Sequence, residues 1–219
     1  MMISPEGYYE EYLKGRTAEE ILKVIRSLKR EIDRLKNIVE NPTYQCKMCP
    51  SEETKIWCNY LYLERAKQAL TELGVEYKPT KAELENKEFD DNIPYISEIR
   101  FSTGNSFGRK IIKTFKFDNG KIFANTFDTA KSKIEDLDVY KVIDIDKDEF
   151  CEQLKDLRIG EWRQDYNLRR YDCFVLDGTE WNLSICFSNG YRTEHKHGSN
   201  VYPYNYESLL ELLEFENND

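Results

Sequence analysis

Three cysteines lie close enough in the sequence to bind one metal ion or to exchange electrons. Two residues separate Cys46 from Cys49, and Cys58 follows in the next predicted helix. A Cys-x-x-Cys turn can offer two thiolates to zinc, or it can form a redox-active dithiol. A structural zinc site needs a fourth ligand, and the neighbouring sequence offers none. We therefore expect three unmetallated cysteines and no cofactor, and Cys46, Cys49 and Cys58 are the ligands if zinc is bound.

The only two histidines, His195 and His197, are spaced so that both lie on one face of a strand. This spacing occurs in metal sites, and Glu194 and Cys186 are close in the predicted hairpin. No carboxylate pattern completes an acid–base set, so we name no catalytic residue. A metal-dependent enzyme that uses His195 and His197 is the third-ranked hypothesis, behind two non-enzymatic ones.

Two further stretches could bind an anion. The segment from Gly104 to Lys110 resembles a phosphate-binding loop, but it has three residues between its glycines instead of four, and Arg109-Lys110 replaces Lys-Ser/Thr. A hairpin loop is the preferred interpretation. Arg169 and Arg170 lie beside tyrosines, and such a set can bind an anion or stack on bases. The alternative is a solvated loop.

The predicted binding surface combines a loop with an acidic helix. Ser and Asn side chains before a Tyr-Pro-Tyr run can recognise a partner, or they can satisfy the backbone while the tyrosines pack over a sheet. The acidic candidates are the closing helix, with Glu214 and Glu216 on the same face, and the interval from Glu83 to Asp91. The candidate binding residues are Arg169, Arg170, Ser199, Asn200, Tyr202, Tyr204, Glu207 and Glu211.

Two Asn-Gly hairpins organise the second half of the chain. In residues 181–187, apolar and polar residues alternate, which predicts a strand with one buried face. A two-residue turn at Asn189-Gly190 would pair Ile185 with Glu194. A three-residue loop with a bulge would pair it with Thr193, and we prefer the bulge because the faces then match. At Asn119-Gly120 a two-residue turn pairs Phe117 with Ile122.

The first half reads as helical. Residues 21–39 carry apolar residues in steps of four and three, typical of a helix–helix seam, and residues 52–73 can form its antiparallel partner. We predict an α+β protein with a helical hairpin domain over residues 1–76, a linker over 77–93, and an antiparallel β-sheet domain with two helices over 94–219. A homodimer through the Ile21–Val39 helix is possible on the same pattern.

Composition narrows the class of partner. The chain has 219 residues, of which 40% are apolar and 33% charged, and its formal net charge is −9. An acidic surface repels nucleic-acid phosphate and anionic lipid, so we expect a protein partner and no membrane. No apolar run is long enough to span a bilayer, the first residues do not form a signal peptide, and the six cysteines are scattered. We expect a cytoplasmic protein.

Several short motifs together resemble a domain of unnamed function in proteins of Gram-positive bacteria and mobile elements. They are Ile159-Gly-Glu-Trp162, Asp177-Gly-Thr-Glu-Trp181, Ser188-Asn-Gly190 and Gly198-Ser-Asn-Val-Tyr-Pro-Tyr204. The resemblance covers about residues 94–215. It implies a mobile-element protein, and such genes often encode inhibitors of host defence, including anti-CRISPR proteins. We expect a non-enzymatic protein-binding module, and its finer form is an inhibitor of a defence nuclease. The alternative is a nucleic-acid-binding or regulatory module.

Overall fold

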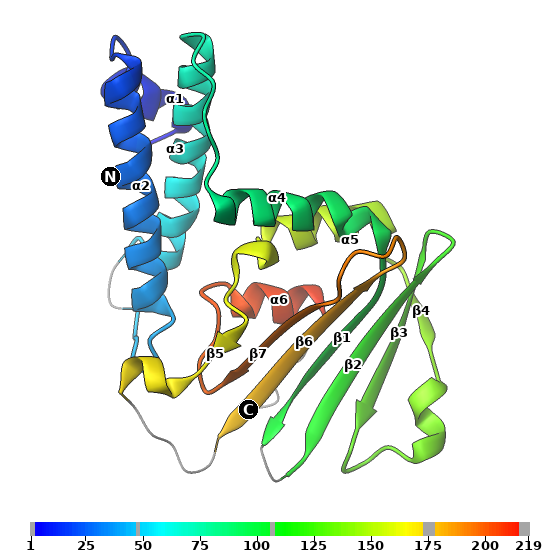
Figure 1. Cartoon of the computed structure of the whole chain (residues 1–219). Coiled ribbons are helices and arrows are strands. Elements are labelled where there is room, and N and C mark those ends of the chain that lie inside the picture. Colours follow the sequence, from blue (N-terminus) through cyan, green and yellow to red (C-terminus); the bar gives the residue numbers. More distant parts are fainter. Residues whose placement is uncertain (1–2, 47–48, 106–107, 173–177, 215–219) are drawn as a thin grey trace. The chain divides into compact units, whose positions relative to one another are not determined.

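The structure is a computed structural model that describes residues 3–46, 49–105, 108–172 and 178–214. The chain divides into two compact units, Met1–Pro79 and Thr80–Asp219. The first unit is helical, and the second combines helices with one seven-stranded sheet. The predicted α+β class and the N-terminal helices are therefore confirmed (Figure 1).

The first unit is built on two long antiparallel helices, α2 (Ala18–Val39) and α3 (Glu52–Glu72) (Figure 1). Thr17 and Glu20 cap α2 reciprocally, each satisfying a backbone N–H at the helix start. Five seam residues of α2 are buried: Ile21, Ile25, Leu28, Ile32 and Leu35. The seam is thus buried inside one chain, and a homodimer through the same residues would have to displace their present neighbours.

A short N-terminal segment packs against α3. It consists of α1 (Pro5–Tyr8) and a π-helical turn, η1 (Tyr9–Leu13). The Tyr62 hydroxyl donates to the Ile3 carbonyl at 2.8 Å and accepts from the Ile3 N–H at 3.1 Å. The Tyr8 ring stacks on the Tyr62 ring at 4.2 Å. These contacts explain why α3 is buried on more than one face, unlike a simple two-helix partner.

The second unit is a sheet with helices on one face (Figure 1). The strand order is β4-β3-β2-β1-β6-β7-β5, antiparallel throughout except for the parallel β5–β7 pair. The strands are β1 (Ile96–Asn105), β2 (Lys110–Asp118), β3 (Lys121–Asp128), β4 (Lys141–Ile143), β5 (Asp165–Tyr166), β6 (Thr179–Phe187) and β7 (Glu194–Ser199). The α-helices are α4 (Lys81–Asn92), α5 (Lys147–Asp156) and α6 (Tyr206–Leu212). The 3-10 turns are η2 (Ile93–Tyr95), η3 (Ile134–Asp138), η4 (Ile159–Glu161) and η5 (Leu168–Tyr171).

The core fills the space between this sheet and its helices. The covered face presents Ile99, Phe101, Phe115, Trp181 and Ile185, all fully buried. The opposite face, which we call the open face, carries the alternate residues of the same strands. Since side chains alternate along a strand, the polar positions of β1 and β6 share this open face.

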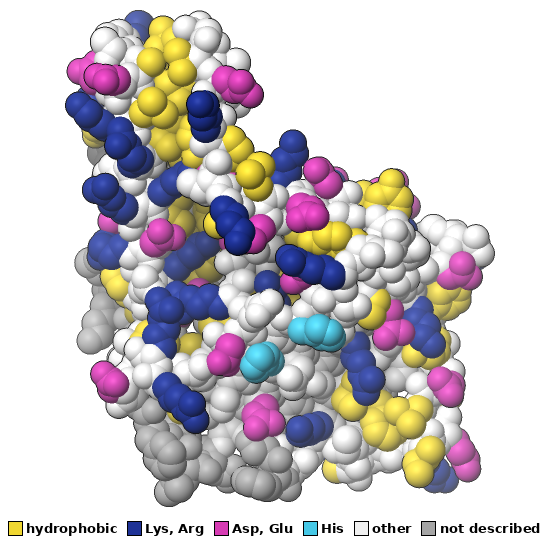
Figure 2. Space-filling model, in the orientation of Figure 1, with side chains coloured by type: hydrophobic (Ala, Val, Ile, Leu, Met, Phe, Trp, Pro, Cys, Tyr) yellow, Lys and Arg dark blue, Asp and Glu magenta, His cyan; other side chains and the backbone are white. Residues whose placement is uncertain are grey.

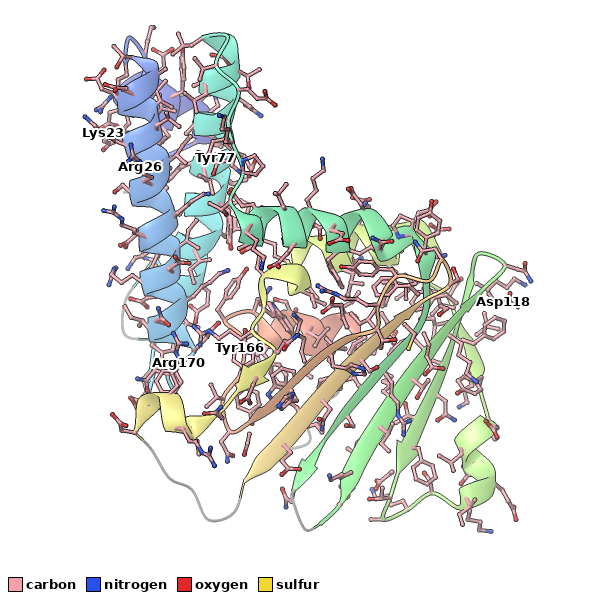
Figure 3. All side chains as sticks on the ribbon, viewed as in Figure 1. Lys23, Arg26, Tyr77, Asp118, Tyr166 and Arg170 are labelled. Carbon is pink, nitrogen blue, oxygen red and sulfur yellow. The ribbon has the colours of Figure 1, made fainter. Side chains whose placement is uncertain are left out.

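The β2–β3 hairpin has the predicted register, with Phe117 opposite Ile122 and Phe115 opposite Ala124. Asp118 marks its tip (Figure 3). Asn119 and Gly120 both have positive φ, 48° and 75°, as a tight Asn-Gly turn requires. Here the apolar faces of both strands and the turn residues favour one register, so sequence reasoning was sufficient.

The preferred register of the β6–β7 hairpin was wrong. Ile185 pairs with Glu194 and Leu183 with Lys196, as in the two-residue-turn alternative, although regular pairing of β7 begins only at Glu194. Glu194 and Lys196 are both buried, on the covered face. The bulge register would keep these charges off the apolar face. They are tolerated there because each has a charged or carbonyl partner.

The interval 77–93, expected to be a linker, contains a third helix of the second unit. Thr80 and Glu83 form a capping box that starts α4. Phe89, which is 2% exposed, anchors the helix on the core. The helix is mostly charged, and Phe89 is its one buried apolar residue. The apolar periodicity was therefore too weak to indicate a helix from sequence.

Candidate functional site

The open face of the sheet carries two rows of polar residues that cross its central strands. In one row Thr114, Arg100, Ser184 and His195 are successive cross-strand neighbours on β2, β1, β6 and β7. Neighbouring strands lie about 4.8 Å apart, so each row places its side chains at regular short intervals. The second row is Ile112, Ser102, Asn182 and His197, and it continues to Asp165 on β5.

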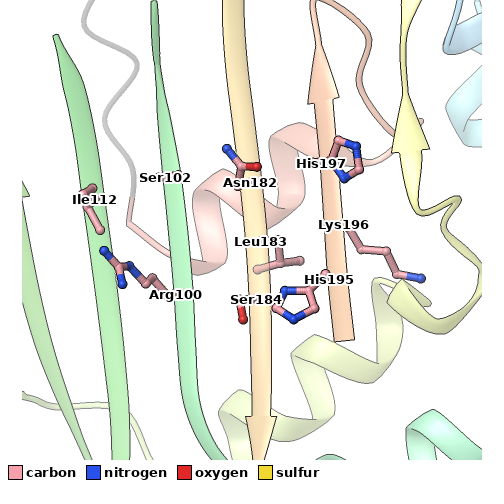
Figure 4. A pocket seen from close by; sticks show the side chains of 9 residues that line it. All are labelled: Arg100, Ser102, Ile112, Asn182, Leu183, Ser184, His195, Lys196 and His197. Carbon is pink, nitrogen blue, oxygen red and sulfur yellow. The ribbon is translucent and has the colours of Figure 1, made fainter. Parts of the chain in front are cut away.

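These rows line a shallow hollow of about 210 Å³, which we call the polar hollow (Figure 4). Figure 4 shows Arg100 reaching over β2 toward Ile112, and His195 turned toward Ser184. In the described chain, five side chains around it have no hydrogen-bond or ion-pair partner from the protein. These are Arg100, Ser102, Asn182, Ser184 and His195.

The two histidines share one strand face, as predicted, and both are exposed near the middle of the open face (Figure 2). His197 Nε2 lies 3.4 Å from Asp165 Oδ1. Cys186 lies on the same face and accepts a weak hydrogen bond from the Thr193 hydroxyl at 3.9 Å. Across the described residues, no three His, Cys, Asp or Glu side chains meet in a way that could hold a metal ion. Asp165 was not foreseen, since a two-residue strand has no sequence signal.

The three candidate zinc ligands differ in environment. Cys46 and Cys49 are exposed, whereas Cys58 is buried on α3. Burial raises the pKa of the Cys58 thiol, which disfavours the thiolate that zinc binds. No disulfide joins any two of the five cysteines that the structure describes.

The segment after Gly104 is the β1–β2 connection, and two of its residues, 106 and 107, lie outside the described chain. The Arg109 guanidinium binds the Asp128 carboxylate, with Nε 2.9 Å from both oxygens. This pairing holds the pKa of Asp128 below its usual value. Arg109 thus joins β2 to the end of β3, as expected for a hairpin and not for a phosphate-binding loop.

Arg169 and Arg170 are exposed on η5, a short turn after β5 (Figure 3). Arg163 lies 5.7 Å from the centre of the Tyr166 ring, and Tyr166 is buried. Tyr166, one of the tyrosines near these arginines, is therefore packed in the core, whereas Tyr171 is half-buried. The structure does not bring Arg169 and Arg170 into the polar hollow lining.

Gly198 and Asn200 of the Gly-Ser-Asn motif make contacts inside the fold. The Asn200 amide oxygen accepts from the Thr179 N–H at 3.0 Å, and a Cβ on Gly178 would lie 1.9 Å from the Asn200 side-chain nitrogen. The Trp181 indole donates to the Val201 carbonyl at 2.9 Å. Residues 178–181 and 198–201 therefore pack directly against each other.

The other motif residues join the same core. Trp162 donates from its indole to the Asn205 side chain at 3.1 Å, and Asn205 in turn donates to the Leu157 carbonyl at 2.7 Å. Tyr202 packs at 4.6 Å on Tyr206 and is only partly exposed. Burial raises the pKa of Tyr202. Of the predicted recognition loop, Ser199 and Tyr204 are the half-buried members that these contacts do not use.

The predicted acidic face on α6 is exposed. Glu207 and Glu211 lie on the outer side of α6, whereas Glu214 reaches within 3.8 Å of the buried Lys113 amine. Glu216 lies outside the described residues. On α4, Asp90 is partly buried, and desolvation raises its pKa to about 6. The acids of the expected linker thus differ in environment.

One buried ionic cluster was not predicted. The Lys196 amine donates to the Trp162 carbonyl at 3.0 Å and lies 3.8 Å from Glu194, which also accepts from Arg192 at 2.7 Å. Burial lowers the pKa of Lys196, with Glu194 opposing that shift. This cluster joins β7 to the residue that follows η4. The sequence signal for it was the alternation of Glu194 and Lys196 with the exposed His195 and His197 along β7.

Sequence reasoning also missed an exposed apolar cluster at the β4 edge of the sheet. Ile134 is 83% exposed and Val142 is 59% exposed; Leu137 and Val139 are 41% and 55% exposed. We call these four residues the edge patch. Apolar side chains gather over this corner of the open face, at the lower right of Figure 2. β4 covers only three of the residues in this region, Lys141–Ile143.

Comparisons with known proteins give no function for this chain, so its function is inferred from the geometry. No family model, no curated protein and no solved structure matches this chain. Throughout the described ranges, none of the helices combines the length and the apolar character needed to cross a bilayer.

Proposed function

We propose that this chain is a non-enzymatic protein-binding module that engages its partner through the edge patch. The exposure of Ile134, Leu137, Val139 and Val142 is the observation that carries the proposal. Single exposed apolar residues are common, but a cluster with polar surroundings is typical of a protein interaction site. These four fall within nine residues of sequence, on η3, β4 and the connection between them.

The strand beside the edge patch supports the same function. β4 is the terminal strand of the sheet order and pairs with β3 through three residues, Ile122 to Ala124. An edge strand presents backbone donors and acceptors along its outer side, and partners commonly add a strand there. We propose that an extended apolar segment of the partner pairs along β4 and covers Val142.

The charges around the edge patch define the partner's chemistry. Between Ile134 and Asp144 the chain carries four carboxylates and one lysine. An acidic rim around an apolar centre complements a partner with a basic rim, such as the nucleic-acid-binding surface of a nuclease. The resemblance to mobile-element proteins supports the finer proposal, in which this module is a phage or mobile-element inhibitor of a host defence nuclease, of the anti-CRISPR kind.

The test compares partner capture by variants that place a charge inside and outside the edge patch. Ile134→Asp and Val142→Asp should each weaken binding by about 30-fold, since interface hot spots contribute about 2 kcal/mol or more. Leu84→Asp is the matched control, because Leu84 is a 52% exposed apolar residue on α4. Equal capture by all three variants would contradict the proposal.

Self-association is the competing outcome. Sedimentation velocity of the wild-type protein at two concentrations should show a monomer if the edge patch serves a different protein. A dimer that Val142→Asp dissociates, while Leu84→Asp does not, would assign the edge patch to a second copy of this chain and overturn the proposal.

A further inference from the structure

We propose that the polar hollow on the open face binds a phosphate group. This site is separate from the edge patch, because it lies on β1, β6 and β7 at the centre of the sheet. Six of its lining residues carry polar side chains on the open face: Arg100, Ser102, Asn182, Ser184, His195 and His197.

The lining is rich in donors and contains no carboxylate. Arg100 contributes a guanidinium with five N–H donors, and the hydroxyls, the amide and the imidazoles add more. Among the six, only His197 has a charged partner in the described chain, Asp165 at 3.4 Å. On the same sheet, Arg109 pairs with Asp128 and Lys110 lies near Glu180. Arg100 has no such carboxylate partner among the described residues.

The positions of the donors fit a compact anion. Arg100 stands on one side of Ser184 in the cross-strand row and His195 on the other. Figure 4 shows His195 turned toward Ser184, while Arg100 lies over β2. An anion resting on Ser102 and Ser184 would have a cationic or imidazole donor on each side. Since Arg100 is exposed, it can change rotamer to reach such an anion.

Phosphate is favoured over a carboxylate by the number of donors. A phosphate monoester offers three strong acceptor oxygens and a charge of about −1.5 to −2, whereas a carboxylate offers two oxygens. The hollow of about 210 Å³ accommodates a group of this size. The net charge of −9 opposes an anion at long range. Exposed charges are screened within about 8 Å at physiological ionic strength, so the nearby donors decide binding.

The proposal is tested by chemical-shift titration of the full chain with inorganic phosphate, a nucleoside monophosphate and acetate. Saturable shifts at Arg100, Ser184 and His195 are expected with phosphate below about 20 mM. Stronger binding of the nucleoside monophosphate would identify a phosphorylated metabolite as the source, whereas equal binding would identify free phosphate. Both outcomes support the phosphate site. Acetate binding as tight as phosphate binding would overturn it.

Matched variants locate the site. Arg100→Gln keeps hydrogen-bond donors but removes the charge, and it should weaken phosphate binding by about tenfold or more. Arg169→Gln, at an exposed arginine of η5 outside the hollow, should leave the affinity unchanged. Equal affinities of the two variants, or no saturable shift in the wild type, would refute the proposal. Neither variant touches the edge patch, so failure here leaves the protein-binding proposal standing.

Discussion

Replacing Gly198 with alanine tests whether the Gly-Ser-Asn motif is part of the core. A Cβ at this position would lie 2.3 Å from the Trp181 indole nitrogen and 2.6 Å from the Val201 carbonyl oxygen. These contacts are far shorter than van der Waals separation. Trp181 is fully buried, so it cannot move aside into solvent. The added methyl group must therefore displace either the indole ring or the backbone that follows β7.

The cost follows from two effects. Overpacking a core by one methyl group costs about 1–3 kcal/mol. Moving the indole also breaks its buried 2.9 Å bond to the Val201 carbonyl, and leaving such a donor unsatisfied costs about 1–3 kcal/mol. We expect Gly198→Ala to lower the free energy of unfolding by about 2–6 kcal/mol, which is a large part of a typical total of 5–15 kcal/mol.

The assay is urea denaturation followed by tryptophan fluorescence. Trp162 and Trp181 lie in edge-to-face contact at 6.3 Å and report this core, whereas the third tryptophan, Trp57, is 63% exposed on α3. Ser199→Ala is the control, because this half-buried neighbour has no side-chain partner in the described chain, and it should stay within about 0.5 kcal/mol of the wild type. A Gly198→Ala variant as stable as Ser199→Ala would refute the packing argument.

The remaining predictions concern the helical unit and one titrating group. Ile25→Asp should destabilise the first unit by several kcal/mol, because Ile25 is 1% exposed and the new charge would be buried. Arg26→Asp, on the exposed side of α2, is the control and should change stability little. Circular dichroism melts compare the two variants. Burial raises the pKa of Asp90 to about 6, above its usual 3.8, so the stability that its protonated form supplies is present at pH 4 and is lost as the pH rises through 6. Asp90→Asn should therefore stabilise the protein by about 1 kcal/mol at pH 8, a value reduced for solvent screening, and not at pH 4. Equal effects at both pH values would contradict this assignment.

Where local and tertiary signals agreed, the sequence predicted the fold. The α2 seam and the Asn119-Gly120 hairpin each combine a periodic apolar pattern with a matching cap or turn. The β6–β7 register was mispredicted because Lys196 is buried against a carbonyl and Glu194, which alternation alone cannot reveal. Helix α4 was missed because one buried residue, Phe89, does most of its apolar packing.

The candidate sites were harder to predict. The histidine pair was placed correctly on one strand face. The neighbours that complete the polar hollow, Arg100 and Asn182, come from strands about 80 residues apart in sequence, and only the strand order shows that these strands are adjacent. The edge patch exists because Ile134 lies outside the core. From sequence alone, a single apolar residue is predicted to be buried. Asn200 illustrates the converse, because a residue expected at a surface is held by Thr179.

The most direct test of the protein-binding proposal is quantitative mass spectrometry of proteins captured from host lysate by the wild type, Ile134→Asp and Leu84→Asp. Far-ultraviolet circular dichroism first establishes that all three are folded. The account predicts at least one protein with a basic surface that the wild type and Leu84→Asp retain and that Ile134→Asp loses by about 30-fold. Retention of the same proteins by Ile134→Asp at wild-type levels would contradict it.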